Sequence, residues 1–319
     1  MRNGTTRAGI VYLSLTGNTK AIAAKIGEEL ASHGAAVSYY DLMEQSNRRN
    51  HPLVVDPAFL RENDLLGFGC FTAAYQPMFF FKRLLDQVGD LSERSSFVFC
   101  TYGVKFGSTL EVMRRSVARS RAVFLGGEAF ACSDEVKDFA LNRIYLRHDR
   151  PGESEFAQAR RFADRVMANH QRAASGARLR PADVAMPRGE PLFRLLGTVV
   201  CRQEVLRRLR GFRIDEAKCA RCGWCVGICP SQSLSFPDGA RAPVVDANCQ
   251  SCGMCFECRQ EAIVPVNAEW GIKSSAKWDH YFYAKAPRKM LDDRELALLR
   301  EDRFRVMKSR PELMTARGL

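Results

Sequence analysis

Residues 8–19 read AGIVYLSLTGNT, an apolar run rich in β-formers that passes directly into a short polar turn. The first six of these residues predict a buried strand. After the turn, Ile22, Ile26 and Leu30 recur at helical spacing and share one face of a helix. A buried strand, a tight turn and an amphipathic helix are together typical of the first unit of an α/β sheet domain.

The same alternation of strand and helix continues to about residue 173. We expect further strands at residues 35–40, 64–69, 95–101 and 121–130, and helices at 78–88, 108–119 and 153–173. The stretch 43–60 is expected to be irregular, with Pro52 and Pro57 as breakers. The sequence therefore predicts a doubly wound, five-stranded parallel sheet that is covered by helices on both faces.

The polar turn between the first strand and the first helix is a candidate phosphate site. Hydroxyl groups and backbone N–H groups at a helix N-terminus bind phosphate without needing a lysine. The sequence has no GxxxxGK[ST] motif, so a nucleotide-cleaving P-loop is not supported. The only GxG, at residues 67–69, lacks the rest of a dinucleotide fingerprint and is interpreted as a strand end. On its own the turn also fits an ordinary helix cap. The candidate phosphate-binding residues are Ser14, Thr16, Gly17, Asn18 and Thr19.

This turn resembles the phosphate loop of flavodoxins, S/T-x-T-G-x-T, which is matched at Ser14, Thr16, Gly17 and Thr19. The resemblance implies FMN, with its isoalloxazine ring held by two loops at the carboxyl ends of the third and fourth strands. Aromatic packing within the loops is the alternative explanation of these residues. The implied ring-binding residues are Cys70, Phe71, Thr72, Ala73 and Tyr75 in the first loop, and Thr101, Tyr102, Gly103, Phe106 and Gly107 in the second.

Two side-chain roles follow from the same resemblance. One of Phe71, Tyr75 and Tyr102 would stack on the flavin ring. Lys105 lies in the second loop, and we hypothesise that its charge stabilises the reduced flavin anion. The acidic loops of free-standing flavodoxins are missing, which argues against a lone electron shuttle.

Eight of the twelve cysteines fall into two closely spaced runs. The runs are Cys219-x2-Cys222-x2-Cys225-x3-Cys229-Pro230 and Cys249-x2-Cys252-x2-Cys255-x2-Cys258. The first resembles the run of bacterial two-cluster ferredoxins, in which three cysteines bind one cubane and the fourth binds the other. The pattern predicts two [4Fe–4S] clusters, one held by Cys219, Cys222, Cys225 and Cys258 and the other by Cys249, Cys252, Cys255 and Cys229.

The second cysteine run departs from the first at its end. Its last two cysteines are separated by two intervening residues rather than three, and Arg259 follows Cys258 where Pro230 follows Cys229. A small loop adjustment would bring Cys258 to the first cluster; without it that cluster would be a three-iron or labile centre. Zinc also takes cysteine quartets and is the second choice of metal. The other cysteines, at 70, 100, 132 and 201, are expected to be small buried side chains.

Charge and composition narrow the class of protein. The formal net charge is +12, and most of it lies in residues 172–218 and 266–319, which flank the cysteine runs. This charge fits a solvated surface, compensation for anionic clusters or docking of an acidic partner. No nucleic-acid-binding motif accompanies it, so no nucleic acid is expected. We expect no signal peptide and no membrane span, hence a reducing cytoplasmic location in which clustered cysteines bind metal.

Taken in order, these features resemble flavodoxin–ferredoxin fusions. We expect an FMN domain at residues 1–173, a basic linker and helix at 174–213, a small α+β two-cluster ferredoxin domain at 214–265 and a C-terminal extension at 266–319 that packs on the domains or docks a partner. The linker should include an amphipathic helix near residues 192–209. The basic flanks and the aromatic residues 278–283 are the candidate docking surface.

The expected function is electron transfer between FMN and a partner redox enzyme through the two clusters, with the protein as low-potential donor to a reductive enzyme. No catalytic residue is assigned. Two alternatives stay open. One is a self-contained flavin-dependent reductase of a small substrate such as a quinone, and the other is an iron–sulfur redox sensor. The sequence does not predict the oligomeric state.

Overall fold

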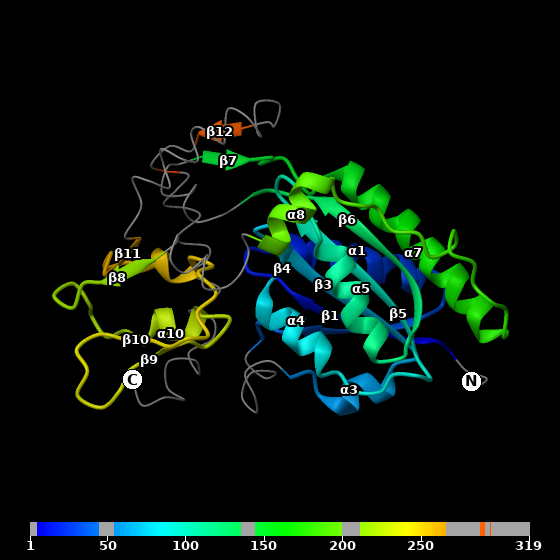
Figure 1. The fold of residues 1–319 in the computed structure, drawn as a ribbon, viewed down its shortest axis with the longest axis horizontal. Coiled ribbons are helices and arrows are strands. Elements are labelled where there is room, and N and C mark those ends of the chain that lie inside the picture. The colour runs from blue at the N-terminus through cyan, green and yellow to red at the C-terminus, as the bar shows by residue number, and fades with distance from the viewer. Residues whose placement is uncertain are drawn as a thin grey trace. The chain divides into compact units, whose positions relative to one another are not determined.

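The computed structural model describes residues 5–44, 54–134, 144–199, 211–265, 288–290 and 294. The chain divides into two compact units (Figure 1). The first unit comprises residues 1–133 and 149–201, and the second comprises residues 134–148 and 202–319. The four-part division by residue number remains a prediction.

A parallel β-sheet forms the centre of the first unit. Its strands follow the order β2-β1-β3-β5-β6, and the short β4 pairs with β3 in the antiparallel sense. This order is that of the flavodoxin-like doubly wound fold, so the predicted fold class is confirmed. The strands are β1 (Arg7–Leu13), β2 (Ala36–Asp41), β3 (Leu65–Ala73), β4 (Gln76–Pro77), β5 (Ser95–Tyr102) and β6 (Val123–Ala131).

Helices cover both faces of this sheet (Figure 1). On one face lie α1 (Asn18–Ser32) and α7 (Glu153–Ala174), and on the other lie α4 (Phe79–Asp86) and α5 (Thr109–Arg119). The predicted inner face of α1 is confirmed, because its two isoleucines and Leu30 are fully buried. The apolar stripe of α7 packs into the same core through Ala159, Phe162, Ala163 and Val166.

The glycine pair at residues 67 and 69 lies inside β3, so the interpretation as a strand end was wrong. A Cβ atom built on Gly67 would lie 2.3 Å from the Phe97 ring, and one on Gly69 would lie 2.0 Å from the Phe99 ring. The two glycines therefore make room for aromatic rings on the neighbouring strand β5.

Pro57 begins a helix rather than breaking one, which corrects a second expectation. It is the first residue of α3 (Pro57–Glu62), where its missing N–H costs nothing and its fixed φ suits a helix start. The Asp56 side chain caps this helix by accepting a hydrogen bond from the Ala58 N–H at 2.7 Å. Pro52 lies outside the described residues.

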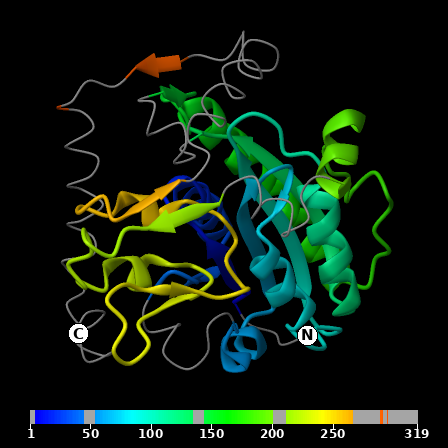
Figure 2. The ribbon, with the colours of Figure 1, turned by 60° about the vertical axis from the view of Figure 1, so that its left-hand side comes forward.

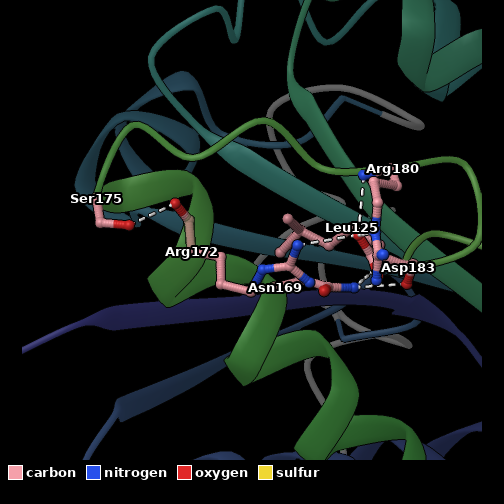
Figure 3. A network of polar contacts seen from close by, with 6 residues as sticks. All are labelled: Leu125, Asn169, Arg172, Ser175, Arg180 and Asp183. Carbon is pink, nitrogen blue, oxygen red and sulfur yellow. Dashed lines mark hydrogen bonds and ion pairs between the residues drawn. The ribbon is translucent and has the colours of Figure 1, made fainter.

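The basic linker is anchored to the first unit by a polar network at the end of α7 (Figure 3). The Asn169 amide donates to the Leu125 carbonyl at 3.0 Å and to the Asp183 carbonyl at 2.7 Å. The Asp183 carboxylate pairs with both Arg172 and Arg180. Asn169 and Asp183 thus fix the linker to edge strand β6.

The linker then runs past two glycines of β6. A Cβ on Gly127 would lie 2.8 Å from the Met186 sulfur, and one on Gly126 would lie 3.9 Å from the backbone of Val184. At Gly127 the absence of a side chain allows this close approach of a second segment, whereas the distance at Gly126 is an ordinary van der Waals contact. The linker leads into helix α8 (Pro191–Val199), which matches the start of the expected amphipathic helix. Residues 200–210 lie outside the described residues.

The second unit holds the cysteine runs among short elements (Figure 2). Two antiparallel pairs, β8 with β11 and β9 with β10, accompany the one-turn helices α10 and η1. The predicted small α+β domain is confirmed. The bounds are β8 (Phe212–Ile214), α10 (Trp224–Ile228), β9 (Leu234–Ser235), β10 (Val244–Val245), η1 (Met254–Glu257) and β11 (Ile263–Pro265).

The C-terminal extension contributes one described element. Strand β12 (Arg288–Met290) pairs antiparallel with β7 (Ile144–Leu146). The aromatic residues 278–283 that were expected to dock a partner lie outside the described residues. Among the helices that the structure describes, none combines the length and apolar character required to cross a bilayer.

Candidate functional site

The turn between β1 and α1 presents backbone donors at a helix start. Gly17 caps α1 with a left-handed backbone, φ 101°, which glycine adopts without strain. Its N–H donates to the Ser14 hydroxyl at 3.2 Å. Among the described residues no side chain caps the first turn of α1, and that turn contains no acidic residue. The positive end of the helix dipole is therefore available to an anion, as the sequence predicted for a phosphate turn.

Two residues of this turn are tied to neighbouring strand ends. The Asn18 amide donates to the Ser133 carbonyl at 3.1 Å, just after β6. The buried Thr19 hydroxyl lies 2.9 Å from the Thr101 hydroxyl on β5. Thr19 and Thr101 are 1% and 2% exposed, so their side chains hold the turn against β5 from inside the protein rather than face a ligand.

The first candidate ring-binding loop is a tight hairpin of residues 71–77, which we call the tyrosine hairpin. Ala74 and Tyr75 form its two-residue turn between β3 and β4, both with left-handed backbones, φ 49° and 70°. Such turns usually contain glycine or asparagine, so the hairpin carries backbone strain. Phe71, Thr72, Ala73 and Tyr75 are all partly exposed, and the Thr72 hydroxyl lies 3.0 Å from the Thr109 hydroxyl.

The second candidate loop, residues 102–107, contacts the tyrosine hairpin. The N–H of Ser108, directly after this loop, donates to the Tyr75 carbonyl at 2.9 Å, and a Cβ on Gly107 would lie 2.5 Å from the Tyr75 Cβ. The rings of Tyr102 and Phe106 lie 5.3 Å apart, and both residues and Gly103 are partly exposed. The structure therefore brings the two predicted loops together at the carboxyl ends of β3 and β5, beside the point where the strand order reverses.

Cys70 is not brought to these loops. Its side chain is fully buried, and its Sγ lies 3.7 Å from the Met113 sulfur. Burial raises the pKa of the Cys70 thiol well above its usual value. A thiol without exposed surface does not reach a ligand, so we withdraw Cys70 from the ring-binding set.

Sequence reasoning missed one part of this site, residues 186–199, which we call the strap. The Phe193 ring packs on the Tyr75 ring at 5.0 Å, and the Gly197 carbonyl accepts a hydrogen bond from the Gln76 amide at 2.5 Å. On the second loop, Lys105 forms an ion pair with Glu190. The strap thus bridges both candidate ring-binding loops. The sequence of residues 189–193, GEPLF, predicts only a part of the linker and its helix.

The first predicted cluster set lines one cavity of about 220 Å³ in the second unit. Trp224 also lines this cavity, and its buried Nε1–H has no acceptor among the residues that the structure describes. An unpaired buried donor beside converging thiols fits an electron-rich guest such as a sulfide-containing cluster. The four cysteines at the cavity are Cys219, Cys222, Cys225 and Cys258.

The second predicted set also forms a group of mutually interacting thiols. Burial, followed by the neighbouring Cys229 and Cys249, raises the pKa of the Cys252 thiol to about 12. Burial, followed by Cys252, Cys229 and Cys249, raises the pKa of the Cys255 thiol well above its usual value. In the first set, burial and then Cys222 raise the pKa of Cys225 to about 12. Thiolates this crowded are stable only beside a strong positive charge, which metal ions supply.

The shorter spacing before Cys258 is absorbed by a change of helix type. In α10 the Gly227 N–H donates to the Gly223 carbonyl four residues back, whereas in η1 the Phe256 N–H donates to the Gly253 carbonyl three residues back. The tighter 3₁₀ turn takes up the missing residue. Cys258 reaches the cavity by this route, so the loop adjustment that the sequence required is present.

Both halves otherwise repeat the same local geometry. Gly223 and Gly253 cap their helices with left-handed backbones, φ 70° and 74°. Ahead of each run an aspartate, Asp215 or Asp246, accepts a hydrogen bond from the N–H two residues on. The two cysteine runs therefore lie in two halves that form an internal structural duplication.

Together the sheet topology and the cysteine geometry define a chain with a flavodoxin-like α/β domain and a ferredoxin-type iron–sulfur domain. A protein-family model described as the 4Fe–4S binding domain matches residues 212–235, which contain the first cysteine run. A comparison with curated proteins finds no match.

Solved structures similar to this chain include several flavodoxins and a rubredoxin oxygen:oxidoreductase. A flavodoxin from Streptococcus pneumoniae TIGR4 is 18% identical, covers 51% of this chain and 99% of its own, and has a TM-score of 0.39. Flavodoxin 2 from Bacillus cereus is 17% identical with coverages of 51% and 99% and a TM-score of 0.38. Rubredoxin oxygen:oxidoreductase from Desulfovibrio gigas is 12% identical with coverages of 53% and 37% and a TM-score of 0.40. The flavodoxin-like class rests on the strand order itself.

Proposed function

We propose that this chain is an electron-transfer protein that binds FMN in its first unit and two [4Fe–4S] clusters in its second. The observation that carries the proposal is the pair of cysteine quartets, one lining a cavity and the other forming a mutually interacting group. Short-range convergence of four thiols is the arrangement that a cubane cluster requires. Electrons pass between the flavin and a partner redox enzyme through the clusters.

The residues at the carboxyl ends of β1, β3 and β5 fit FMN. The uncapped first turn of α1 and the Ser14 hydroxyl suit its phosphate. The partly exposed aromatic rings of Tyr75 and Tyr102 suit its apolar ring system. When bound, FMN supplies exchange of either one or two electrons.

The cysteines would bind the two clusters in crossed sets. One set is Cys219, Cys222, Cys225 and Cys258, and the other is Cys249, Cys252, Cys255 and Cys229. Each cluster supplies one-electron transfer. Since one chain carries both kinds of group, their effective concentration is set by the chain and not by encounter.

A protein with eight clustered thiols suits the reducing cytoplasm, where they stay available to iron. We propose that it serves a reductive enzyme as low-potential donor. The basic charge flanking the cysteines supports docking of an acidic partner.

The position of the strap favours the electron-transfer function over a reductase that turns over a small substrate at the flavin. Phe193 packs on Tyr75, and Glu190 pairs with Lys105, so a protein segment occupies space beside both candidate ring-binding loops. A flavin-dependent quinone reductase needs that space open. Turnover of a quinone by the purified chain without a partner would favour the reductase instead.

Anaerobic purification followed by metal, sulfide and flavin analysis tests the proposal. We expect one FMN and about eight iron and eight sulfide per chain, with a brown colour, because each cubane holds four of each. A matched variant, Cys252→Ser, should lower iron and sulfide while leaving FMN bound. Colourless protein, or zinc in place of iron, would contradict the proposal.

A further inference from the structure

Cys229 lies beside two hydroxyl groups that have no counterpart at Cys258 among the residues that the structure describes. Its Sγ lies 3.4 Å from the Ser233 hydroxyl and 3.5 Å from the Ser231 hydroxyl. The two hydroxyls lie 2.9 Å from each other. Ser233 is 2% exposed and Ser231 is 9% exposed, so water does not compete strongly for these contacts.

The duplication of the second unit identifies the matching position at the other cluster set. Three residues after each final cysteine, Gln232 and Glu261 both have a backbone φ of 51°. One residue further on, the Ser233 carbonyl accepts from the Asp246 N–H at 2.9 Å, and the Ala262 carbonyl accepts from the Asp215 N–H at 2.7 Å. Ser233 and Ala262 are therefore structural equivalents.

The two cluster sets thus differ by a buried hydroxyl at one defined place. Ala262 lines the cavity of the first set beside Cys258. Its methyl group cannot form a hydrogen bond, whereas the Ser233 hydroxyl lies within hydrogen-bond distance of the Cys229 sulfur. The Ser233 backbone N–H also lies 3.4 Å from the Cys229 sulfur, and this donor is independent of the side chain.

We propose that Ser233, supported by Ser231, raises the reduction potential of the cluster that Cys229 binds. This inference rests on the proposed function, since it assumes the two clusters. A metal-bound thiolate only accepts hydrogen bonds, so the serine hydroxyls must donate toward it, directly or through one another. Hydrogen bonds to cluster sulfurs stabilise the more negative, reduced state and raise the potential. One electron is gained, no bond breaks, and the hydroxyl protons stay on the serine oxygens.

Ser233 is accordingly a positioning residue for electron transfer, because it acts on the cluster through Cys229. It makes the two clusters unequal in a way that the cysteine pattern does not encode. The equivalence of residues 233 and 262 also provides reciprocal variants. Ser233→Ala gives the second set the side chain that the first set already tolerates, and Ala262→Ser gives the first set the hydroxyl.

The test is a redox titration of the full, anaerobically reconstituted chain, monitored by the EPR signals of the reduced clusters. In Ser233→Ala we expect one midpoint to become more negative, with about a tenfold fall in the ratio of reduced to oxidised cluster at a fixed potential, or about 59 mV. In Ala262→Ser the other midpoint should become more positive. The control is Gln232→Ala. Gln232 lies between the two serines but contributes no hydroxyl to the contacts with Cys229, so its exchange should leave both midpoints unchanged.

A second measurement tests the hydrogen bond directly. Electron–nuclear double resonance identifies the exchangeable proton coupling of the Cys229 cluster as the one that disappears in deuterated buffer, and this coupling should be weaker in Ser233→Ala than in wild type. The inference is overturned if neither midpoint moves in Ser233→Ala, or if both variants shift the same midpoint. Wild-type protein without two four-iron signals would instead overturn the proposed function, so the two failures are told apart by the parent protein.

Discussion

Lys105 and Glu190 form an ion pair that joins the second candidate ring-binding loop to the strap. The same ammonium lies 5.7 Å from the centre of the Phe193 ring. The Lys105 charge that was expected to act on the flavin is therefore partly balanced by a carboxylate of this chain. This pairing modifies the hypothesis for Lys105, because the effect of the lysine now depends on Glu190.

We expect Glu190→Gln and Lys105→Ala to shift the flavin potential in opposite directions. Removing the carboxylate leaves the lysine charge unbalanced and makes the flavin easier to reduce, whereas removing the lysine makes it harder. Both side chains are at least one third exposed, so the free energy of unfolding should change by less than about 1 kcal/mol. A potentiometric titration that follows flavin absorption measures both shifts. Equal midpoints in both variants and wild type would remove Lys105 and Glu190 from the flavin site.

Phe193→Ala should loosen the strap and weaken FMN binding. Phe193 is 3% exposed and packs on Tyr75, so its truncation should cost about 3 kcal/mol of unfolding free energy. Leu192→Ala is the matched control on the same helix, because Leu192 is 53% exposed and its loss should change stability by less than about 0.5 kcal/mol. Urea unfolding and flavin fluorescence titration measure the two effects. FMN affinity that is the same in both variants would show that the strap does not support the flavin loops.

Asp183 should make the linker anchor sensitive to acid. Hydrogen bonds from the Arg180 side chain, followed by Arg172, hold the pKa of the Asp183 carboxyl well below its usual range. A depressed pKa stabilises the fold above the unfolded pKa of about 4, and this contribution is lost as the pH falls toward the folded value. Wild type should therefore exceed Asp183→Asn in stability at pH 7, and the difference should shrink below about pH 4. Urea midpoints measured from pH 7 to pH 3 provide the comparison, and a gap that stays constant with pH would contradict the role of the carboxylate.

Cys258→Ser should damage only one cluster. Because Cys258 is the fourth thiol at the cavity of the first set, its loss should reduce iron from about eight per chain to between about four and seven. The control is Cys70→Ala, which removes a buried thiol from the core of the first unit and should leave both iron and FMN content unchanged. Iron, sulfide and EPR analysis distinguish a three-iron centre from a missing one. Full iron content in Cys258→Ser would show that another residue completes the first cluster.

The main architecture followed from local patterns. Buried strands in a parallel sheet are continuous apolar runs, so β1 and β5 were found close to their true bounds. The inner face of α1 followed from helical periodicity. The cysteine runs were equally informative, because the chemistry of a cubane imposes short, fixed spacings on its ligands.

What the sequence did not predict depends on contacts between distant segments. Gly67 and Gly69 are required by aromatic rings on a neighbouring strand, which a local GxG pattern does not reveal. The ion pair of Lys105 with Glu190 joins residues 85 positions apart. Pro57 was misread because the same residue that breaks a helix interior favours a helix start.

The equivalence of Ser233 and Ala262 could be predicted from the sequence only in part. Both follow a final cysteine by four residues, so an alignment of the two halves from that cysteine would have paired them. The donation to Cys229, however, depends on the backbone turn that brings the Ser233 hydroxyl back to the sulfur.

Flash photoreduction of the flavin in the anaerobic full-length protein tests the central claim most directly. If FMN and the clusters exchange electrons within one chain, bleaching of the clusters near 400 nm should follow flavin reduction with a first-order rate constant that is independent of protein concentration. Flavin reduction without bleaching, or a rate that rises in proportion to protein concentration, would contradict the account.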